Sequence, residues 1–129
     1  MEVKLQNQRP KHLNLLKIRQ PLPAIVSILH RMSGVLLFFP GIPLFLYGMQ
    51  RLLESPQGFE VLLDDLQHPI GRLLLLSPLW LFFHHLCAGI RHLLLDLHVG
   101  VQLAQARTSS KLVLVAGMVL TLLTGLWLW

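Results

Sequence analysis

The sequence is poor in charge and in cysteine. Only 13% of its 129 residues are charged while 53% are hydrophobic, which is too apolar for a soluble domain of this size. The single cysteine, Cys87, excludes an internal disulfide framework and a cysteine-held iron–sulfur cluster. No Cys-x-x-Cys-His segment is present for covalent haem attachment, and no Gly-x-Gly-x-x-Gly segment for a flavin-binding fold. The composition therefore predicts a membrane protein, in which any haem is bound non-covalently.

Three apolar stretches are long enough to cross a hydrocarbon core of about 30 Å, which takes about 20 helical residues. They cover 25–53, 71–97 and 112–129. We expect an all-α membrane protein with a polar N-terminal arm at 1–24 and a three-helix transmembrane domain at 25–129. Turn residues at both ends of the first loop predict a short interfacial helix inside it. Pro40 and Pro43 lack backbone donors, so the first span is expected to kink or unwind there.

The charges predict an orientation rather than a nucleic-acid partner. Of the eleven Lys and Arg residues, six lie in 4–31 and three in 91–111, whereas four of the six acidic residues lie in the loop at 54–65. They stand at the ends of apolar runs and form no basic stripe. The positive-inside rule places the N-terminus and second loop in the cytoplasm. The first loop and the C-terminus, with Trp127 and Trp129 in an outer aromatic belt, are predicted on the opposite side.

Small residues repeat on one face in two of the spans. They are Ser27, Gly34, Gly41 and Gly48 in the first span and Gly117, Thr121 and Gly125 in the third. Such stripes let membrane helices approach one another closely. The simpler interpretation of these residues is tight packing alone. Because three helices bury little by themselves, however, two such stripes also indicate a larger heteromeric helical bundle.

The stretch FFHHLCAGIRHLLLD places several ionisable residues inside the second span, where such groups are costly and usually functional. At 100° per residue His85, Gly89, His92 and Asp96 share one face, while His84 points about 100° away from His85. The two adjacent histidines are therefore expected to have different roles.

A non-covalent haem needs an axial imidazole, a flat open space and cations near its propionates. His85 offers the imidazole, and Gly89, one turn away, leaves space for the ring. Arg91 and His92 lie about 9 to 10 Å further along the helix, which is propionate distance. Alternatively, His85 only hydrogen-bonds a neighbouring helix, and Arg91 and His92 are cytoplasmic anchors. Zinc is disfavoured, because His85 and His92 are two turns apart without a third ligand.

These segments resemble a known family, the cytochrome b membrane-anchor subunits of succinate dehydrogenase, respiratory complex II. The resemblance rests on SILHRMSG at 27–34, HLCAGIRHLLLD at 85–96, Arg-Pro at 9–10 and three spans with these loop lengths. It covers nearly the whole chain. The pair S-x-x-H-R-x-S-G and H-x-x-x-G-I-R-H-x-x-x-D is far more specific than either motif alone.

The resemblance implies one b-type haem that is shared with a second anchor subunit. His85 would be one axial ligand of the haem iron, and a histidine of the partner subunit would be the other. His30 would lie between quinone and haem, and Arg31 and His92 would lie beside the propionates. The chain would thus carry half of the haem site.

The resemblance also implies that Ser27 and Arg31 belong to a ubiquinone site. These residues are one turn apart at the cytoplasmic end of the first span, with His30 beside them. A hydroxyl donor, a fixed cation and an imidazole could hold a quinone carbonyl and stabilise the negative charge that develops on it. The simpler interpretation, a helix cap and a snorkelling arginine, explains His30 poorly.

By this hypothesis the chain is a non-dehydrogenating subunit that passes electrons from succinate oxidation to ubiquinone in the respiratory chain and the tricarboxylic acid cycle. An iron–sulfur subunit and a flavoprotein subunit would supply the electrons, and membrane lipids would surround the helices. We expect a bacterial inner membrane, with the C-terminus on the periplasmic side. The alternatives are a fumarate reductase-type menaquinone anchor, a cofactor-free membrane assembly protein, and a histidine-lined metal or proton transporter.

Overall fold

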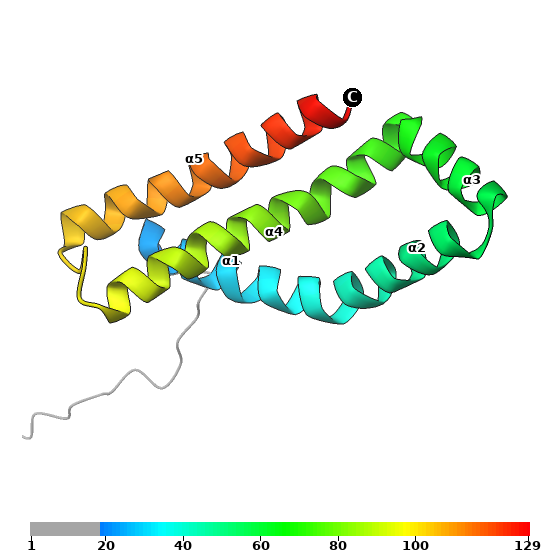
Figure 1. Ribbon diagram of the computed structural model, residues 1–129. Helices are drawn as coiled ribbons and strands as arrows, with labels where there is room; N and C mark the ends of the chain where they lie inside the picture. Colours follow the sequence, from blue (N-terminus) through cyan, green and yellow to red (C-terminus); the bar gives the residue numbers. More distant parts are fainter. Residues whose placement is uncertain (1–18) are drawn as a thin grey trace, which may run out of the picture.

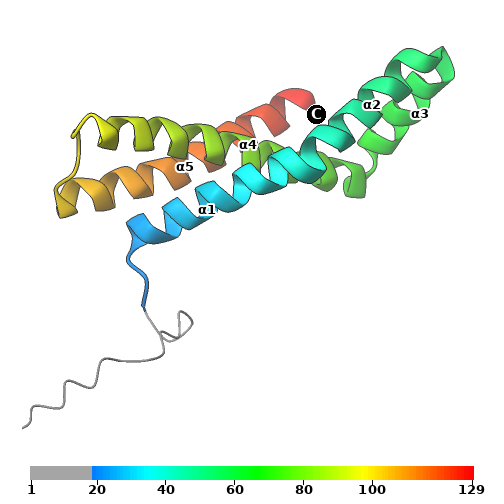
Figure 2. The same ribbon diagram turned by 90° about the horizontal axis from the view of Figure 1, so that it is seen from below.

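The chain forms an antiparallel arrangement of long helices (Figures 1 and 2). The computed structural model describes residues 19–129, and no strand occurs within them. Three helical segments are long and apolar enough to cross a membrane: Leu22–Glu54, Pro69–Asp96 and Leu103–Leu128. The predicted all-α, three-span fold class is therefore confirmed. Most of the expected N-terminal arm, residues 1–18, lies outside the described residues.

The first membrane-spanning segment is a rod with a wide turn near its middle. It consists of α1 (Leu22–Leu36), the π-helical turn η1 (Leu37–Gly41) and α2 (Ile42–Glu54). Pro40 lies inside η1, and Pro43 follows in the first turn of α2. A proline removes one backbone donor and crowds the preceding turn, which the wider π-helical turn accommodates. The predicted disruption of this helix is therefore present, and the rod bends there (Figure 1).

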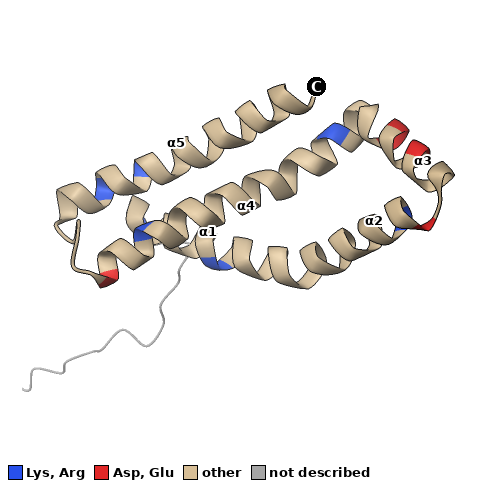
Figure 3. Cartoon of the chain, in the orientation of Figure 1, with Lys and Arg blue, Asp and Glu red and all other residues tan. Residues whose placement is uncertain are grey.

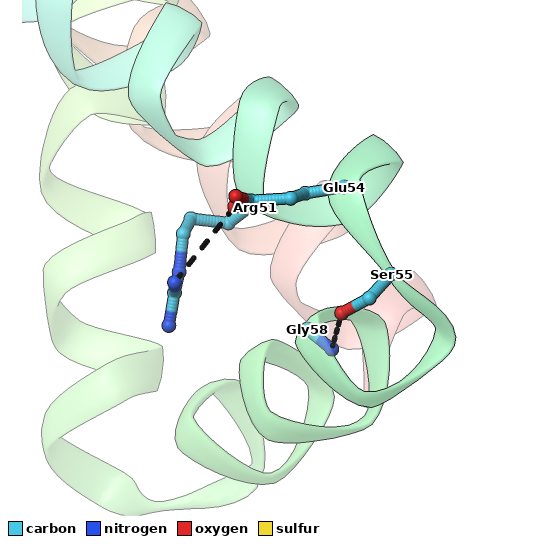
Figure 4. Close-up of polar contacts among 4 residues, drawn as sticks. All are labelled: Arg51, Glu54, Ser55 and Gly58. Atoms are coloured by element: carbon cyan, nitrogen blue, oxygen red, sulfur yellow. Dashed lines mark hydrogen bonds and ion pairs between the residues drawn. The ribbon is translucent and has the colours of Figure 1, made fainter.

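The first loop contains the expected short helix, α3 (Pro56–Gln67). The Ser55 side chain accepts a hydrogen bond of 3.0 Å from the Gly58 N–H and so caps the start of α3 (Figure 4). Arg51 and Glu54 form an exposed ion pair of 4.0 Å in the last turn of α2. Such a surface pair contributes little stability, so the serine cap and the proline at the first helical position define this corner.

The second and third spans are α4 (Pro69–Asp96) and α5 (Leu103–Leu128), and α4 contacts both α1 and α5. A turn with left-handed backbone at His98 and Gly100 joins them. The helix α5 begins at Leu103, nine residues before the apolar run that the sequence assigned to the third span. Residues 103–111 contain neither Gly nor Pro, so the helix continues through this polar segment. The apolar run indicates membrane depth, not where the helix starts.

The three spans meet at a small core formed by one residue from each: Val26, Ala88 and Val113. Many other large apolar side chains are exposed, among them Phe39, Phe45 and Leu126. An apolar surface of this extent suits contact with lipid and with other helices. The chain is therefore a multi-pass membrane protein whose outer faces have no partner within the described residues.

The small-residue stripe of α5 packs inside this chain. A methyl group placed at Gly117 would lie 3.3 Å from Cα of His84, and one at Gly125 would lie 3.0 Å from Cδ2 of Leu76. Thr121 is buried between them and donates a 2.7 Å hydrogen bond to the Gly117 carbonyl. The stripe therefore provides tight packing against α4 within this chain, and the larger bundle does not depend on it.

Charged residues gather at the two ends of the bundle (Figure 3). Arg31, Arg91, Asp96, Arg107 and Lys111 lie toward the end at which α1 and α5 begin. Arg51, Glu54, Glu60, Asp64, Asp65 and Arg72 lie toward the end that carries α3. One end is thus mainly basic and the other mainly acidic, which is the asymmetry on which the predicted orientation depends.

Candidate functional site: a clamped histidine beside an apolar groove

The half-buried imidazole of His85 projects from α4 toward α1. Its Nδ1 lies 3.1 Å from the His30 carbonyl oxygen and 3.1 Å from Oγ of Ser33. The Ser33 hydroxyl also donates a 2.8 Å hydrogen bond to the same carbonyl. Within residues 19–129, no hydrogen bond involves Nε2 of His85. One ring nitrogen is therefore held by α1, while the other is available to a ligand.

Both α1 and the His30 ring restrict the orientation of the His85 ring. The His30 imidazole stacks on it with the ring centroids 4.2 Å apart and the planes 16° from parallel. On α1, a methyl group placed at Gly34 would lie only 2.9 Å from Cε1 of His85. Any residue larger than glycine at this position would push the ring aside. The position of the His85 ring between Gly34 and the His30 ring is thus closely defined, and we call this position the seat of His85.

An apolar groove of about 520 Å³ lies next to this seat. Its walls are Gly34, Leu37, Phe38, Gly41, Ile42 and Phe45 on the first rod, and Pro78, Phe82 and His85 on α4. Phe38, Phe45 and Phe82 are each more than half exposed, so the groove opens at the surface of the bundle. A large apolar space with one oriented imidazole has the features that a b-type haem requires. The described residues therefore fit such a group, and the open side leaves room for a second ligand.

Three imidazoles form a row next to the groove. The His30 ring lies between His85 and His92, with its centroid 5.0 Å from that of His92. Gly89 lies beside this row, since a methyl group placed there would be in ordinary contact with Nε2 of His30 at 3.5 Å. The space at Gly89, which the sequence assigned to a haem ring, is thus next to His30. Among the described residues, no group of three or more His, Cys, Asp or Glu side chains could hold a metal ion.

Arg91 does not face the groove. Its side chain is buried against α5, where Nε donates to Oγ of Ser109 at 3.0 Å and Nη2 to the Ala106 carbonyl at 3.4 Å. The axial distance from His85 suggested a propionate contact, but six residues of helix also turn the side chain about 120° away. The predicted propionate role of Arg91 is therefore wrong, because this guanidinium joins α4 to α5.

His84 also faces α5. It is only 1% exposed, packs beneath Gly117 and stacks on Trp80 with the ring centroids 5.3 Å apart. Neither of its ring nitrogens has a hydrogen-bond partner among the described residues. The structure thus confirms that the adjacent histidines point in different directions, and only His85 lines the groove.

Ser27 and Arg31 lie one turn apart on α1, toward the basic end of the bundle. Ser27 is half-buried and Arg31 is exposed. With Met32, Val35 and Leu36, Arg31 lines an apolar depression of about 310 Å³. Ser27 and Arg31 are thus one turn apart, as the sequence predicted, and of the two only Arg31 lines the depression.

Sequence reasoning overlooked Ser33. The residue belongs to the S-x-x-H-R-x-S-G motif, but its partner His85 is 52 positions away and its other partner is a backbone carbonyl. No signal in the sequence joins Ser33 to His85, because the contact depends on how α1 packs against α4.

The chain matches known proteins over nearly its whole length. Residues 6–124 match the model of a family described as succinate dehydrogenase/fumarate reductase transmembrane subunit. The chain is 36% identical over 126 residues to the succinate dehydrogenase cytochrome b556 subunit of Coxiella burnetii, covering 95% of this chain and 98% of that protein. It is 33% identical over 119 residues to the subunit of the same name from Paracoccus denitrificans, covering 92% and 91%.

The match includes the first two spans, α5 as far as residue 124, and the segments that carry His30, His85 and His92. The chain therefore belongs to the family of succinate dehydrogenase/fumarate reductase transmembrane subunits, among the cytochrome b membrane anchors of succinate dehydrogenase.

Proposed function

We propose that this chain binds one b-type haem jointly with a second anchor subunit and forms part of the ubiquinone-reduction site of succinate dehydrogenase. The observation that carries the proposal is the His85 imidazole, held by α1 at Nδ1 and placed in the wall of an open apolar groove. A bound haem would supply a one-electron redox centre inside the membrane.

In this proposal His85 is one axial ligand through Nε2, and a histidine of the partner anchor is the other. The half-open groove supports a shared site, because residues of this chain line only part of it. His92 and Arg31 would neighbour the propionates from the basic end of the bundle. His30, stacked on His85, would connect the haem with the quinone site.

Ser27 and Arg31 would bind the quinone headgroup. The Ser27 hydroxyl can donate to a quinone carbonyl, and the Arg31 guanidinium can stabilise the negative charge that develops during reduction. The apolar depression beside Arg31 suits the hydrophobic tail. Reduction of a quinone also needs protons, and a site at the edge of the membrane lies within reach of water.

We further propose that the basic end of the bundle faces the cytoplasm of a bacterium, where an iron–sulfur subunit and a flavoprotein subunit would dock. These subunits would oxidise succinate, so this chain would be the non-dehydrogenating part of a succinate:quinone oxidoreductase. The basic surface from Arg107 and Lys111 supports docking at this end.

Two adjacent histidines provide a matched test of the haem ligand. His85→Ala should abolish or strongly weaken haem binding, whereas His84→Ala should keep the haem, because His84 faces α5 and lies outside the groove. The measurement is a reduced-minus-oxidised spectrum of the purified complex, normalised to its subunit content. If only His84→Ala removed the absorbance, the ligand assignment would be refuted, and a colourless wild-type complex would favour a cofactor-free anchor.

A further inference from the structure

We propose that Ser33 is a positioning residue that orients His85 and sets the strength with which its Nε2 donates electrons to a bound metal. This inference rests on the proposed haem-ligand role of His85. It concerns residues of α1 that hold the other nitrogen of the ring, and it assigns Ser33 a role distinct from those of Ser27 and Arg31.

The surroundings of the His85 ring identify which of its nitrogens carries the proton. A carbonyl oxygen can only accept a hydrogen bond, and the His30 carbonyl lies 3.1 Å from Nδ1 of His85. An unprotonated Nδ1 would direct its lone pair at that oxygen and be repelled. Nδ1 therefore carries the proton, and Nε2 keeps the lone pair that a metal requires.

The Ser33 hydroxyl accepts a hydrogen bond from the same nitrogen of His85. Because its own hydrogen is donated to the His30 carbonyl at 2.8 Å, the lone pairs of Oγ are free to accept from Nδ1–H at 3.1 Å. Ser33 is only 1% exposed, so water cannot readily replace this acceptor. The Ser33 hydroxyl therefore accepts a hydrogen bond from Nδ1–H of His85. It also donates a hydrogen bond to the His30 carbonyl, which is the second acceptor of that proton.

The hydrogen bonds at Nδ1 affect how Nε2 binds a metal. An acceptor on the distal N–H orients the ring and makes the metal-binding nitrogen more basic. A more basic ligand stabilises ferric over ferrous iron and so lowers the reduction potential. Loss of the Ser33 hydroxyl should therefore raise the potential and weaken retention of the haem, even though His85 itself remains.

The experiment compares three variants in the purified complex. Ser33→Ala removes the acceptor, and Ser33→Thr keeps a hydroxyl. Ser110→Ala is the matched control, because Ser110 is also fully buried and donates to a carbonyl of its own helix at 2.7 Å, but on α5 and away from His85. Haem content per complex, the midpoint potential and the low-temperature electron paramagnetic resonance spectrum of the haem are measured for each.

We expect Ser33→Ala to lose about tenfold or more in haem affinity. If ferric affinity falls tenfold more than ferrous affinity, the midpoint potential rises by about 59 mV. Ser33→Thr should restore most of the wild-type values, and Ser110→Ala should match the wild type.

Two outcomes distinguish this inference from the proposed function. A wild-type complex without haem would overturn both. A wild-type complex that holds haem through His85, together with a Ser33→Ala variant of unchanged potential and spectrum, would overturn the inference alone. An equal change in Ser33→Ala and Ser110→Ala would also overturn it, because it would show a general effect on packing.

Discussion

At the scale of single residues, the polar side chains of α4 point in two different directions. His85 faces α1 and the groove, whereas His84 and Arg91 face α5. The 100° step between neighbours predicted the separation of the two histidines. The same geometry would have placed Arg91 correctly had its angle been considered together with its distance. Ser33 could not be predicted, because its contact with His85 depends on how α1 packs against α4.

The polar pair at the start of the first rod leads to a prediction on activity. Ser27→Ala and Arg31→Leu should lower quinone reductase activity about 10- to 100-fold, the range expected for loss of a hydrogen bond to a charged group. Succinate oxidation with a soluble dye should change little, because the dye does not need the membrane site.

Ser77→Ala and Arg51→Leu are the controls, since both residues are exposed and lie away from the basic end of the bundle. Equal losses of the two activities in Ser27→Ala and Arg31→Leu would contradict a quinone site at these residues.

At the scale of helices, hydropathy predicted the existence and order of the spans, and proline predicted the disruption of the first one. Hydropathy did not predict the start of α5, because polar residues without Gly or Pro can extend a helix beyond the membrane. The small-residue stripes showed that close packing occurs but not which neighbour each contacts. The α5 stripe meets α4 inside the chain, whereas a methyl group placed at Gly48 of α2 would meet no neighbouring helix or side chain within 4 Å among the described residues.

Two glycines of the first rod form a matched pair for testing the approach of α1 to α4. Gly34→Ala adds a methyl group 2.9 Å from Cε1 of His85, so the ring must rotate away. A rotation of about 30° costs about 1 kcal/mol, which predicts a loss of haem affinity of several-fold. Gly48→Ala should have no such effect. The measurement is haem content per complex, and a Gly34→Ala variant with a wild-type haem content would show that the seat of His85 is wider than described.

At the scale of the whole molecule, α1 packs against α4 and α5, whereas α2 contacts only η1 and α3 within the described part of the chain. The first rod therefore diverges from α4 beyond its π-helical turn, which is visible in Figure 1. The groove lies at this divergence and includes residues from both sides of the turn. Arg31, three residues before Gly34 on α1, lies on the side of the groove that is nearer the basic end of the bundle.

The orientation gives a prediction for the assembled membrane protein. A reporter fused after Trp129 should be active only outside the cytoplasm, and one inserted in the turn at 97–102 only inside it. The physical reason is the excess of Lys and Arg at one end of the bundle. Alkaline phosphatase and green fluorescent protein fusions measure the two compartments. Cytoplasmic activity of the reporter after Trp129 would reverse the proposed topology.

The divergence of α2 from α4 also bears on assembly. A bilayer interior leaves no vacuum, so acyl chains must fill the wedge between these helices whenever the chain stands alone. A companion helix that docks there releases those lipids, and regained lipid freedom is one of the forces that join membrane helices. The bend in the first rod therefore leaves the subunit poorly packed by lipid when it is alone, and this favours its association with another helix.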